Sequence, residues 1–172
     1  CKAGDTLDIM GPLGNGFPLK KKKAFLIGGG IGIPPMVQLA KELNGEKQVV
    51  AGYRNEQIFL GEELGEHAAF YVATEDGSRG TKGNVLDCIR ENELKADVIF
   101  ACGPMPMLRA IKEYAAANNM EAYISLEEHM ACGVGACLGC VCKTKNVDAH
   151  SHVHNSRICT DGPVYNAEEV EI

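Results

Sequence analysis

The sequence predicts an α/β protein built on a doubly wound, five-stranded parallel sheet, followed by a small cysteine-rich subdomain. Five apolar runs alternate with segments of helical periodicity between residues 24 and 126, which is the order expected of consecutive βαβ units. A glycine-rich turn follows the first apolar run, as it does in many sheets of this class. After residue 126 the alternation ends and glycine and cysteine dominate, which predicts a boundary there.

The elements follow in a regular order along the chain. Residues 1–19 predict a short strand around Leu7 and Ile9 that runs into a glycine- and proline-rich loop, and the lysines at 20–23 predict a solvated linker. Predicted strands then occupy residues 24–29, 47–53, 67–74, 96–103 and 120–127. Predicted helices occupy residues 34–44, 56–64, 83–92 and 104–119. Each crossover between parallel strands should be right-handed.

Size and composition limit the possible functions. The chain has 172 residues, so it can bury a sizeable core and needs no disulfides to fold. Its formal charge of −6 argues against nucleic acid or an anionic membrane as a partner. No apolar stretch approaches the ~20 residues that span a bilayer. The eight cysteines indicate metal or iron–sulfur ligation in a reducing compartment, the cytoplasm, rather than disulfides.

The turn GGGIGIPPM at residues 28–36 lies between a predicted strand and a predicted helix. Doubly wound sheets bind the pyrophosphate of a dinucleotide at this point, because small residues let backbone amides and a helix N-terminus approach the phosphates. Pro35 stands where the usual fingerprint has its third glycine, and proline is tolerated in a first helical turn. A tight turn without a ligand is the alternative, but the position after the first strand favours a dinucleotide.

Two further segments end at the same edge of the predicted sheet, where ligands of such sheets bind. One is CGPMPML at 102–108, whose Gly103 permits close approach of a flat ring, and the other is the polar loop 74–85, which suits an adenosine. The candidate nucleotide-binding residues are Gly28, Gly29, Gly30, Ile31, Gly32, Ile33, Pro34, Pro35, Glu75, Asp76, Cys102, Gly103, Pro104 and Met105. After the second strand, Arg54 favours NADP whereas Glu56 favours NAD, so this choice stays open.

A cluster of cysteines begins soon after the sheet. The run CGVGACLGC places Cys132, Cys137 and Cys140 in a C-x4-C-x2-C pattern, and Cys159 follows further on. This is the spacing of plant-type [2Fe–2S] ligation. The glycines between the cysteines allow the backbone angles that turn several thiolates inward, and they leave amides free to hydrogen-bond sulfur. The pattern therefore favours a [2Fe–2S] cluster.

Other interpretations of the same residues remain open. Structural zinc usually takes C-x2-C pairs, which the first spacing of four does not match, and a Rieske centre needs histidines inside the motif. Cys142 points to the same side of an extended segment as Cys140, so it is a surplus ligand candidate. His150, His152 and His154 alternate and offer a zinc site, although a solvent-facing edge explains them more simply.

The two predicted cofactors exchange different numbers of electrons. A nicotinamide gives or takes a hydride, whereas a [2Fe–2S] cluster passes one electron at a time, and a flavin is the common converter between them. No segment from residue 24 to residue 172 resembles a second dinucleotide site. Because the chain opens on Cys1 rather than on methionine, we expect the flavin in a domain upstream, with residues 1–19 as its tail.

The motifs GPLGNGF, GGGIGIPPM, CGPMPML, EEHMACGVGACLGCVC and CTDGPVY occur in this order along the chain. Their order and spacing resemble the electron-transfer subunits of class 1B dihydroorotate dehydrogenases, which belong to the ferredoxin-reductase-like flavoproteins. The resemblance spans essentially the whole chain and is most specific in its C-terminal third. It implies the last strand and loop of an FAD-binding β-barrel at 1–19, a ferredoxin-reductase-type NAD domain at 20–126, and a [2Fe–2S] subdomain at 127–172.

The resemblance also implies roles for residues and a partner. The implied cluster ligands are Cys132, Cys137, Cys140 and Cys159; residues 28–35 would cradle the NAD phosphates, and residues 102–104 would lie near nicotinamide and flavin. The FAD-anchoring motif of the family has no counterpart in the chain, so no FAD residue is assigned. The implied partner is an FMN-containing catalytic subunit, in a heterotetramer, that oxidises dihydroorotate to orotate in pyrimidine biosynthesis. Electrons would pass through the cluster and FAD to NAD⁺, and no catalytic acid, base or nucleophile is expected here.

Two alternatives compete with this interpretation. The nearer one is the small subunit of an NADPH:ferredoxin oxidoreductase or of a sulfide dehydrogenase, which shares the same layout. The more distant one is a zinc-stabilised nucleotide-binding module without redox activity. The C-terminal run CTDGPVYNAEEVEI favours the dihydroorotate assignment. We further expect the isolated chain to lose FAD but to keep its cluster.

Overall fold

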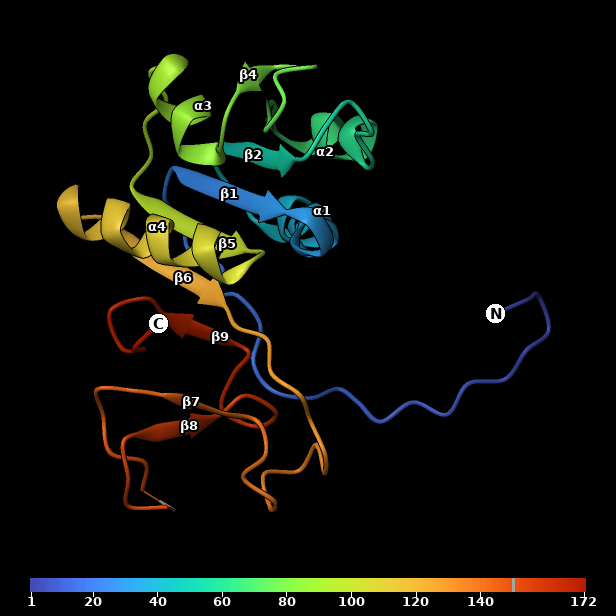
Figure 1. Cartoon of the computed structure of the whole chain (residues 1–172), viewed down its shortest axis with the longest axis vertical. Helices are drawn as coiled ribbons and strands as arrows, with labels where there is room; N and C mark the ends of the chain where they lie inside the picture. The colour runs from blue at the N-terminus through green and yellow to red at the C-terminus, as the bar shows by residue number, and fades with distance from the viewer. Residues whose placement is uncertain (150) are drawn as a thin grey trace.

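The main body is a twisted sheet whose strands are β1 (Ala24–Gly29), β2 (Lys47–Tyr53), β3 (Ala69–Thr74), β4 (Thr81–Lys82), β5 (Val98–Cys102), β6 (Glu121–Ser125) and β9 (Val164–Asn166). The computed structural model describes residues 1–149 and 151–172 and places these strands in the order β4-β3-β2-β1-β5-β6-β9 (Figure 1). The helical elements are the 3-10 turn η1 (Gly30–Gly32), α1 (Ile33–Glu42), α2 (Gly61–His67), α3 (Val85–Glu91) and α4 (Met105–Ala117). A second, two-stranded sheet pairs β7 (Val141–Lys143) with β8 (Asn155–Arg157).

The five long strands are all parallel, which confirms the predicted fold class. The chain moves outward from β1 through β2 to β3 and then returns to β5 on the other side of β1. Sheets of this kind bind ligands at the carboxyl ends of the strands where the order reverses, which is here between β1 and β5. The register aligns Gly28 with Cys102 and Gly29 with Gly52. The predicted glycine turn therefore leaves the sheet between the ends of β2 and β5.

A short strand extends the sheet at each edge. The two-residue β4 runs parallel to β3, and the three-residue β9 runs antiparallel to β6. Neither is predicted from the sequence, because runs of two or three residues carry no readable period. Strand β9 also brings the C-terminal segment of the chain onto the β6 edge of the sheet.

The four predicted helices are present, and α2 lies furthest from its expected position. The sequence predicts a helix over 56–64, whereas α2 spans Gly61–His67. Leu60 precedes it with a left-handed φ of 58°, and such a residue interrupts a right-handed helix. Residues 56–60 therefore form a loop beside the end of β2. Within the described part of the chain, no helix has the length and apolar character needed to cross a membrane.

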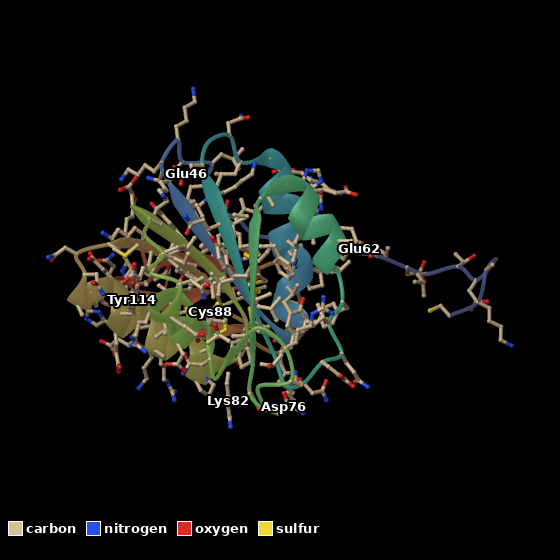
Figure 2. All side chains as sticks on the ribbon, turned by 90° about the horizontal axis from the view of Figure 1, so that it is seen from above. Glu46, Glu62, Asp76, Lys82, Cys88 and Tyr114 are labelled. Carbon is tan, nitrogen blue, oxygen red and sulfur yellow. The ribbon has the colours of Figure 1, made fainter. Side chains whose placement is uncertain are left out.

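Apolar side chains pack on both faces of the sheet, because successive strand residues point to opposite sides. Seen from above, the sheet stands between α1 and α2 on one side and α3 and α4 on the other (Figure 2). The first core joins strand residues such as Leu26 and Phe100 to Met36 and Leu39 of α1. The second core joins Phe25 and its neighbours to α3 and α4.

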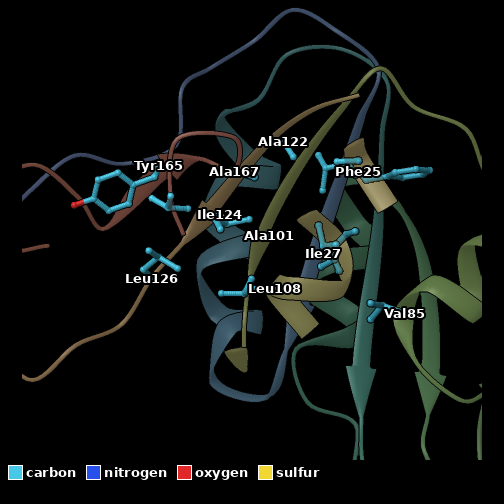
Figure 3. Packing of buried hydrophobic residues seen from close by; sticks show 14 of the residues in the cluster. Phe25, Ile27, Val85, Ala101, Leu108, Ala122, Ile124, Leu126, Tyr165 and Ala167 are labelled. Carbon is cyan, nitrogen blue, oxygen red and sulfur yellow. The ribbon is translucent and has the colours of Figure 1, made fainter. Parts of the chain in front are cut away.

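The second core continues beyond the sheet into the C-terminal segment. Figure 3 shows Leu108 of α4 and Ile124 of β6 packed in the same cluster as Tyr165 and Ala167. This cluster also contains Cys140, Ile158 and Cys159, each almost fully buried. The cysteine-bearing segment therefore shares one apolar core with the sheet.

The strand predicted around Leu7 and Ile9 is wrong. Residues 1–10 contain no strand, Leu7 and Ile9 are 64% and 85% exposed, and this part of the chain extends away from the body in Figure 1. Alternating apolar residues form a strand where a hydrogen-bonded neighbour is available, and the described chain offers none here. Further along, Phe17 docks edge-on against Phe100, with 5.8 Å between ring centroids.

The lysine linker is fixed to the sheet by the carboxylate of Glu121 at the start of β6. Lys20 and Lys22 each place Nζ 3.0 Å from a different oxygen of this carboxylate, and the hydroxyl of Tyr123 donates to it at 2.6 Å. The Tyr123 hydrogen bond, followed by those of the two lysines, lowers the pKa of Glu121 to about 2. The linker is therefore held by charges rather than solvated along its whole length.

We expect Glu121→Gln to lower the free energy of unfolding at pH 7 by about 1 kcal/mol, because the carboxylate is 25% exposed and solvent screens its ion pairs. A carboxyl whose pKa is lowered on folding stabilises above its unfolded pKa, near 4.3, and loses that contribution as pH falls through its folded pKa. The difference between the two proteins should therefore shrink from pH ~4.5 toward pH ~2. Urea unfolding over this range measures it, and a difference independent of pH would contradict the role of the charge.

Candidate functional site

A cleft of about 870 Å³ opens at the carboxyl ends of the parallel strands. It extends over the ends of β1, β2 and β3 and the first turns of α3 and α4. Its lining residues are Gly29, Gly30, Gly52, Tyr53, Arg54, Asn55, Gln57, Phe59, Glu75, Gly83, Asn84, Val85, Leu86, Pro104, Pro106, Met107 and Ala110. The cleft thus lies where the strand order reverses, at the place that doubly wound sheets use for ligands.

Close backbone contacts shape the inner wall of this cleft. A Cβ on Gly32 would collide with the carbonyl oxygen of Cys102, and one on Gly29 would lie 2.8 Å from the sulfur of Met107. Gly30 has a left-handed φ of 55° and open space where its side chain would be. Glycine is therefore required for packing at residue 32, whereas a Cβ at residue 29 would displace the flexible Met107 side chain, and Gly30 leaves room at the mouth of the cleft.

Four of the predicted nucleotide-binding residues line the cleft, namely Gly29, Gly30, Glu75 and Pro104. The remaining predicted residues, which do not line it, are Gly28, Ile31, Gly32, Ile33, Pro34, Pro35, Asp76, Cys102, Gly103 and Met105. Several of these act on the cleft indirectly. Ile33 is buried under the glycine turn, and Gly103 lies against Gly29 across the turn.

The outer wall of the cleft combines an aromatic pair with groups of both charges. The rings of Tyr53 and Phe59 meet edge to face at 5.4 Å, and the Tyr53 hydroxyl donates to the Phe59 carbonyl at 2.7 Å. Burial raises the pKa of Tyr53 to about 12, so this hydroxyl stays neutral. Arg54 and Glu75 both line the cleft, whereas Glu56 does not.

The sequence points to the segments 74–85 and 102–108, but it does not identify Asn84 or Met107 as lining residues, which α3 and α4 bring to the cleft. Asn84 caps α3, its side chain accepting hydrogen bonds from the amides of Leu86 and Asp87 at 2.8 and 3.1 Å. The local signal for this cap is the capping box of Asn84 and Asp87, which marks a helix start but names no ligand. Met107 enters the cleft because α4 begins directly beside the glycine turn.

Cys102 lies at the end of β5, next to the glycine turn but outside the lining of the cleft. It is partly buried, and burial raises the pKa of its thiol, with a hydrogen bond to Ser125 acting in the opposite direction. The thiol is therefore neutral at physiological pH. Its environment fits the packed core residue that the sequence allows as well as the predicted neighbour of a ring.

The four cysteines of the predicted cluster come together from two segments of the chain. Cys132, Cys137 and Cys140 belong to the loop after β6, and Cys159 belongs to the turn after β8. Cys137 acts on the pKa of the Cys132 thiol, and both Cys140 and Cys132 act on the pKa of the Cys159 thiol, so the four thiols are near neighbours. Among the described residues, no three potential ligands converge on a single point that would hold one metal ion.

The backbone of the cysteine loop turns its amides toward sulfur. The amide of Cys137 donates to Cys132 Sγ at 3.4 Å, and the amide of Gly139 donates to Cys137 Sγ at 3.3 Å. Amides of residues 134 and 137 lower the pKa of the Cys132 thiol to about 6. Gly133 and Gly135 adopt left-handed φ values of 70° and 77°, which glycine supports without strain. The loop thus stabilises the thiolate of Cys132, the form that binds metal, whereas burial raises the pKa of the Cys159 thiol.

This donor set fits a two-iron cluster. A [2Fe–2S] centre of the plant type takes four cysteine ligands in a C-x4-C-x2-C…C spacing, which these residues match better than the C-x2-C pairs usual for structural zinc. Cys140 and Cys159 are buried, whereas Cys137 is exposed and Cys132 partly so. One pair therefore belongs to the core and the other lies near the surface.

The surplus candidates lie apart from this arrangement. Cys142 points into the second core near Tyr165, and burial raises its pKa. His154 contacts the Lys145 carbonyl oxygen through Nδ1 at 2.9 Å, and His152 is exposed. His150 lies outside the described residues, so the predicted histidine edge cannot be described as a whole.

Two family models match the chain in the order of its parts. Residues 26–113 match the oxidoreductase NAD-binding domain. Residues 127–171 match the iron–sulfur cluster binding domain of dihydroorotate dehydrogenase B. The first match covers β1 to α4, and the second covers the cysteine loop and everything up to β9.

Curated relatives extend the similarity over nearly the whole chain. It is 46% identical over 180 residues to the dihydroorotate dehydrogenase B (NAD(+)), electron transfer subunit of Bacillus velezensis, covering 99% of this chain and 68% of that protein. The subunit of the same name from Geobacillus sp. is 45% identical over 177 residues, covering 98% of this chain and 66% of the relative. The chain thus spans about two thirds of the length of these relatives.

Solved structures share the architecture. A chain of the NADH-dependent reduced ferredoxin–NADP oxidoreductase, studied for flavin-based electron bifurcation, is 30% identical with a TM-score of 0.85, covering 99% of this chain and 62% of that one. The C-terminal domain of a hydrogenase from Pyrococcus furiosus shares the fold alone. It is 20% identical with a TM-score of 0.54, over 67% of this chain and 100% of that domain.

Proposed function

Because the chain belongs to the family of dihydroorotate dehydrogenase B electron-transfer subunits, we propose that it carries electrons from an FMN-containing dihydroorotate dehydrogenase subunit, by way of a [2Fe–2S] cluster and FAD, to NAD⁺. One observation carries the proposal: two of the four candidate cluster cysteines, Cys140 and Cys159, lie in the same apolar core as the α3 and α4 residues that border a cleft of dinucleotide type. A hydride carrier and a one-electron carrier in one protein need a converter between them, and a flavin is the common one.

In this proposal Cys132, Cys137, Cys140 and Cys159 hold the cluster, which when bound takes up and releases one electron at a time. The protein's own contribution is to supply four cysteine thiols from two segments, the loop after β6 and the turn after β8. The amides of Cys137 and Gly139 already donate to sulfur, and such bonds stabilise the negative charge that thiolates carry. Burial of Cys140 and Cys159 keeps water from one side of the site.

The cleft is the proposed NAD(H) site. Residues 28–35 would approach the pyrophosphate through backbone amides at the start of α1, and residues 102–105 would border the nicotinamide. Glu75, with Asp76 beside it, would face the adenosine half, and a carboxylate there favours the free ribose hydroxyls of NAD over the phosphate of NADP. Arg54 on the same wall would favour NADP, so binding of both nucleotides has to be measured.

We propose the same division of the chain as the sequence predicts, with boundaries at 1–19, 20–126 and 127–172. The matched ranges 26–113 and 127–171 support the second and third parts. All eight cysteines are free thiols that form no disulfide bond, and this supports a reducing compartment, the cytoplasm. The proposed partner is the FMN-containing subunit that oxidises dihydroorotate to orotate, in a heterotetramer, and this chain itself would bind neither compound.

The test is to purify the chain without oxygen and to measure iron, sulfide, flavin and the visible spectrum. The expected result is two irons per chain with sulfur-to-iron absorption that dithionite bleaches, no retained FAD, and quenching of NADH fluorescence on binding. A colourless protein that contains zinc would overturn the proposal. Stoichiometric FAD in this chain would overturn the assignment of flavin binding to another part of the protein.

The related ferredoxin–NADP oxidoreductase structure favours one second candidate, an electron-transfer subunit that serves ferredoxin. The partner separates the two functions. Co-purification with an FMN-containing subunit that oxidises dihydroorotate supports the first, whereas co-purification with a large subunit of the glutamate synthase type supports the second. Tighter binding of NADPH than of NADH would also support the second function, an electron-transfer subunit that serves ferredoxin.

A further inference from the structure

The turn that carries Cys159 is closed around a single carbonyl group. The amides of Thr160, Asp161 and Gly162 all donate to the carbonyl oxygen of Arg157, at 3.2, 2.8 and 3.3 Å. The Arg157 side chain closes the same turn from outside, with Nε and Nη2 donating to the Asp161 carboxylate at 3.0 and 3.2 Å. The amide groups of this turn are therefore satisfied from within.

The carbonyl groups of the same three residues are satisfied by one residue from the other end of the chain. Asn15 donates from Nδ2 to the carbonyl oxygens of Thr160 and Asp161, at 3.2 and 3.3 Å. Its backbone amide donates to the carbonyl oxygen of Gly162 at 2.5 Å. Asn15 also forms an isolated parallel bridge with Pro163. A single asparagine thus contacts three consecutive peptide groups directly after Cys159.

The backbone on both sides of this contact leaves no room for adjustment. Gly14 has a left-handed φ of 65°, and a Cβ there would collide with the Gly162 carbonyl. A Cβ on Gly162 would lie 2.6 Å from the ring of Tyr165. The amide of Leu126, where the chain leaves β6, donates to the Pro163 carbonyl at 2.8 Å. Three segments therefore meet at the end of the Cys159 turn.

The placement of this turn decides how Cys159 faces the cysteine loop. The Ile158 amide donates to the Cys140 carbonyl oxygen at 2.8 Å. A Cβ on Gly135 would lie 3.0 Å from Thr160 Cγ2 and 3.3 Å from Arg157 Nη1. The turn and the loop are thus in direct contact, and a shift of the turn moves one thiol of the buried pair relative to the other three.

We propose that Asn15 is a positioning residue for the iron–sulfur centre, acting through the three carbonyl groups to fix the turn that carries Cys159. The proposal rests on the proposed function as far as the cluster is concerned. Groups that hold a metal ligand in place commonly change metal affinity by 10- to 100-fold when they are lost. Asn15 lies in the segment that precedes the lysine linker, so it also ties the N-terminal part of the chain to the cluster turn.

The test compares Asn15→Asp with the wild-type chain. Aspartate has nearly the same shape, but it lacks the two N–H donors of Nδ2 and places a negative oxygen against two carbonyl groups. The matched control is Asn118→Asp, because Asn118 is an exposed asparagine at the end of α4 whose Nδ2 donates to the Tyr114 carbonyl at 2.7 Å. Both variants add the same charge.

The expected result for Asn15→Asp is release of iron to a chelator about 10-fold faster than in wild type, with altered g-values in the electron paramagnetic resonance spectrum of the reduced cluster. Asn118→Asp should match wild type in both. Equal release rates and equal spectra in all three proteins would overturn the proposal.

A second measurement keeps the inference separate from the proposed function. Hydrogen exchange of the cluster-free chains should be faster in Asn15→Asp than in wild type at the amides of residues 160–162, and unchanged in Asn118→Asp. If the wild type binds no iron, the proposed function fails and this exchange result alone decides whether Asn15 fixes the turn. Exchange rates in Asn15→Asp equal to those of wild type at residues 160–162 would overturn the inference that Asn15 fixes this turn.

Discussion

Replacing Cys140 by serine is expected to reduce the iron content of the anaerobically purified chain by about 10-fold or more, because a lost ligand costs at least as much as a lost supporting group. Cys140 is 2% exposed and Cys159 is 1% exposed, and the Cys140 side chain contributes to the raised pKa of the Cys159 thiol. A serine hydroxyl at neutral pH is a much poorer metal ligand than a thiolate. The measurement is iron and sulfide per chain, together with the visible spectrum.

Cys142→Ser is the matched control for this prediction. Cys142 lies two residues further along, in the middle of β7, and its thiol is next to the hydroxyl of Tyr165. We expect this variant to keep its iron and its spectrum, with a small loss of stability from placing a hydroxyl in apolar surroundings. Loss of the cluster in Cys142→Ser, with retention in Cys140→Ser, would show that Cys142 rather than Cys140 is the ligand.

The second large effect is expected in stability. Phe100→Ala should lower the free energy of unfolding by about 3–5 kcal/mol, the usual range for removing a buried phenylalanine. Phe100 is fully buried in the centre of β5, stacks on Tyr123 with 5.8 Å between ring centroids, and receives the edge of Phe17 at the same distance. Its loss therefore opens a cavity and removes the ring on which Phe17 docks.

Urea unfolding of the nucleotide-free chain measures this effect. Two further variants serve as comparisons. Phe100→Leu keeps most of the apolar volume, so it should remain folded and lose less stability than Phe100→Ala. Phe59→Ala removes a ring that is 43% exposed and should cost about 1 kcal/mol. Equal losses in Phe100→Ala and Phe59→Ala would show that the aromatic stack does not anchor the core.

The sequence predicts the parallel sheet correctly because its signals are local. Each buried strand is a run of apolar residues, and each helix repeats them at a spacing near 3.6. The spacing of Cys132, Cys137 and Cys140 is equally local, and so is the glycine turn after β1. The same reasoning predicts the start of α2 at the wrong residue, because the residue types around Leu60 do not indicate the left-handed backbone conformation of Leu60.

The lining of the cleft could be predicted only in part. The ends of β1, β3 and β5 point to Gly29, Glu75 and Pro104 because parallel strands end at one edge of a sheet. Phe59 and Met107 reach the cleft through the path of a loop and the packing of α4, which leave no period in the sequence. The short strand β9 is unreadable for a related reason, because its pairing with β6 depends on where the C-terminal segment packs.

Local order in the sequence therefore determined the class of the sheet, the position of the nucleotide turn and the cysteines that form the predicted cluster. The tertiary structure alone decided which of those cysteines are buried, which loops close the cleft, and that Asn15 meets Thr160 across 145 positions of sequence. The physical reason is that periodicity and spacing reflect the bonds and burial of near neighbours. Contacts between distant segments follow from the packing of the whole chain around its two cores.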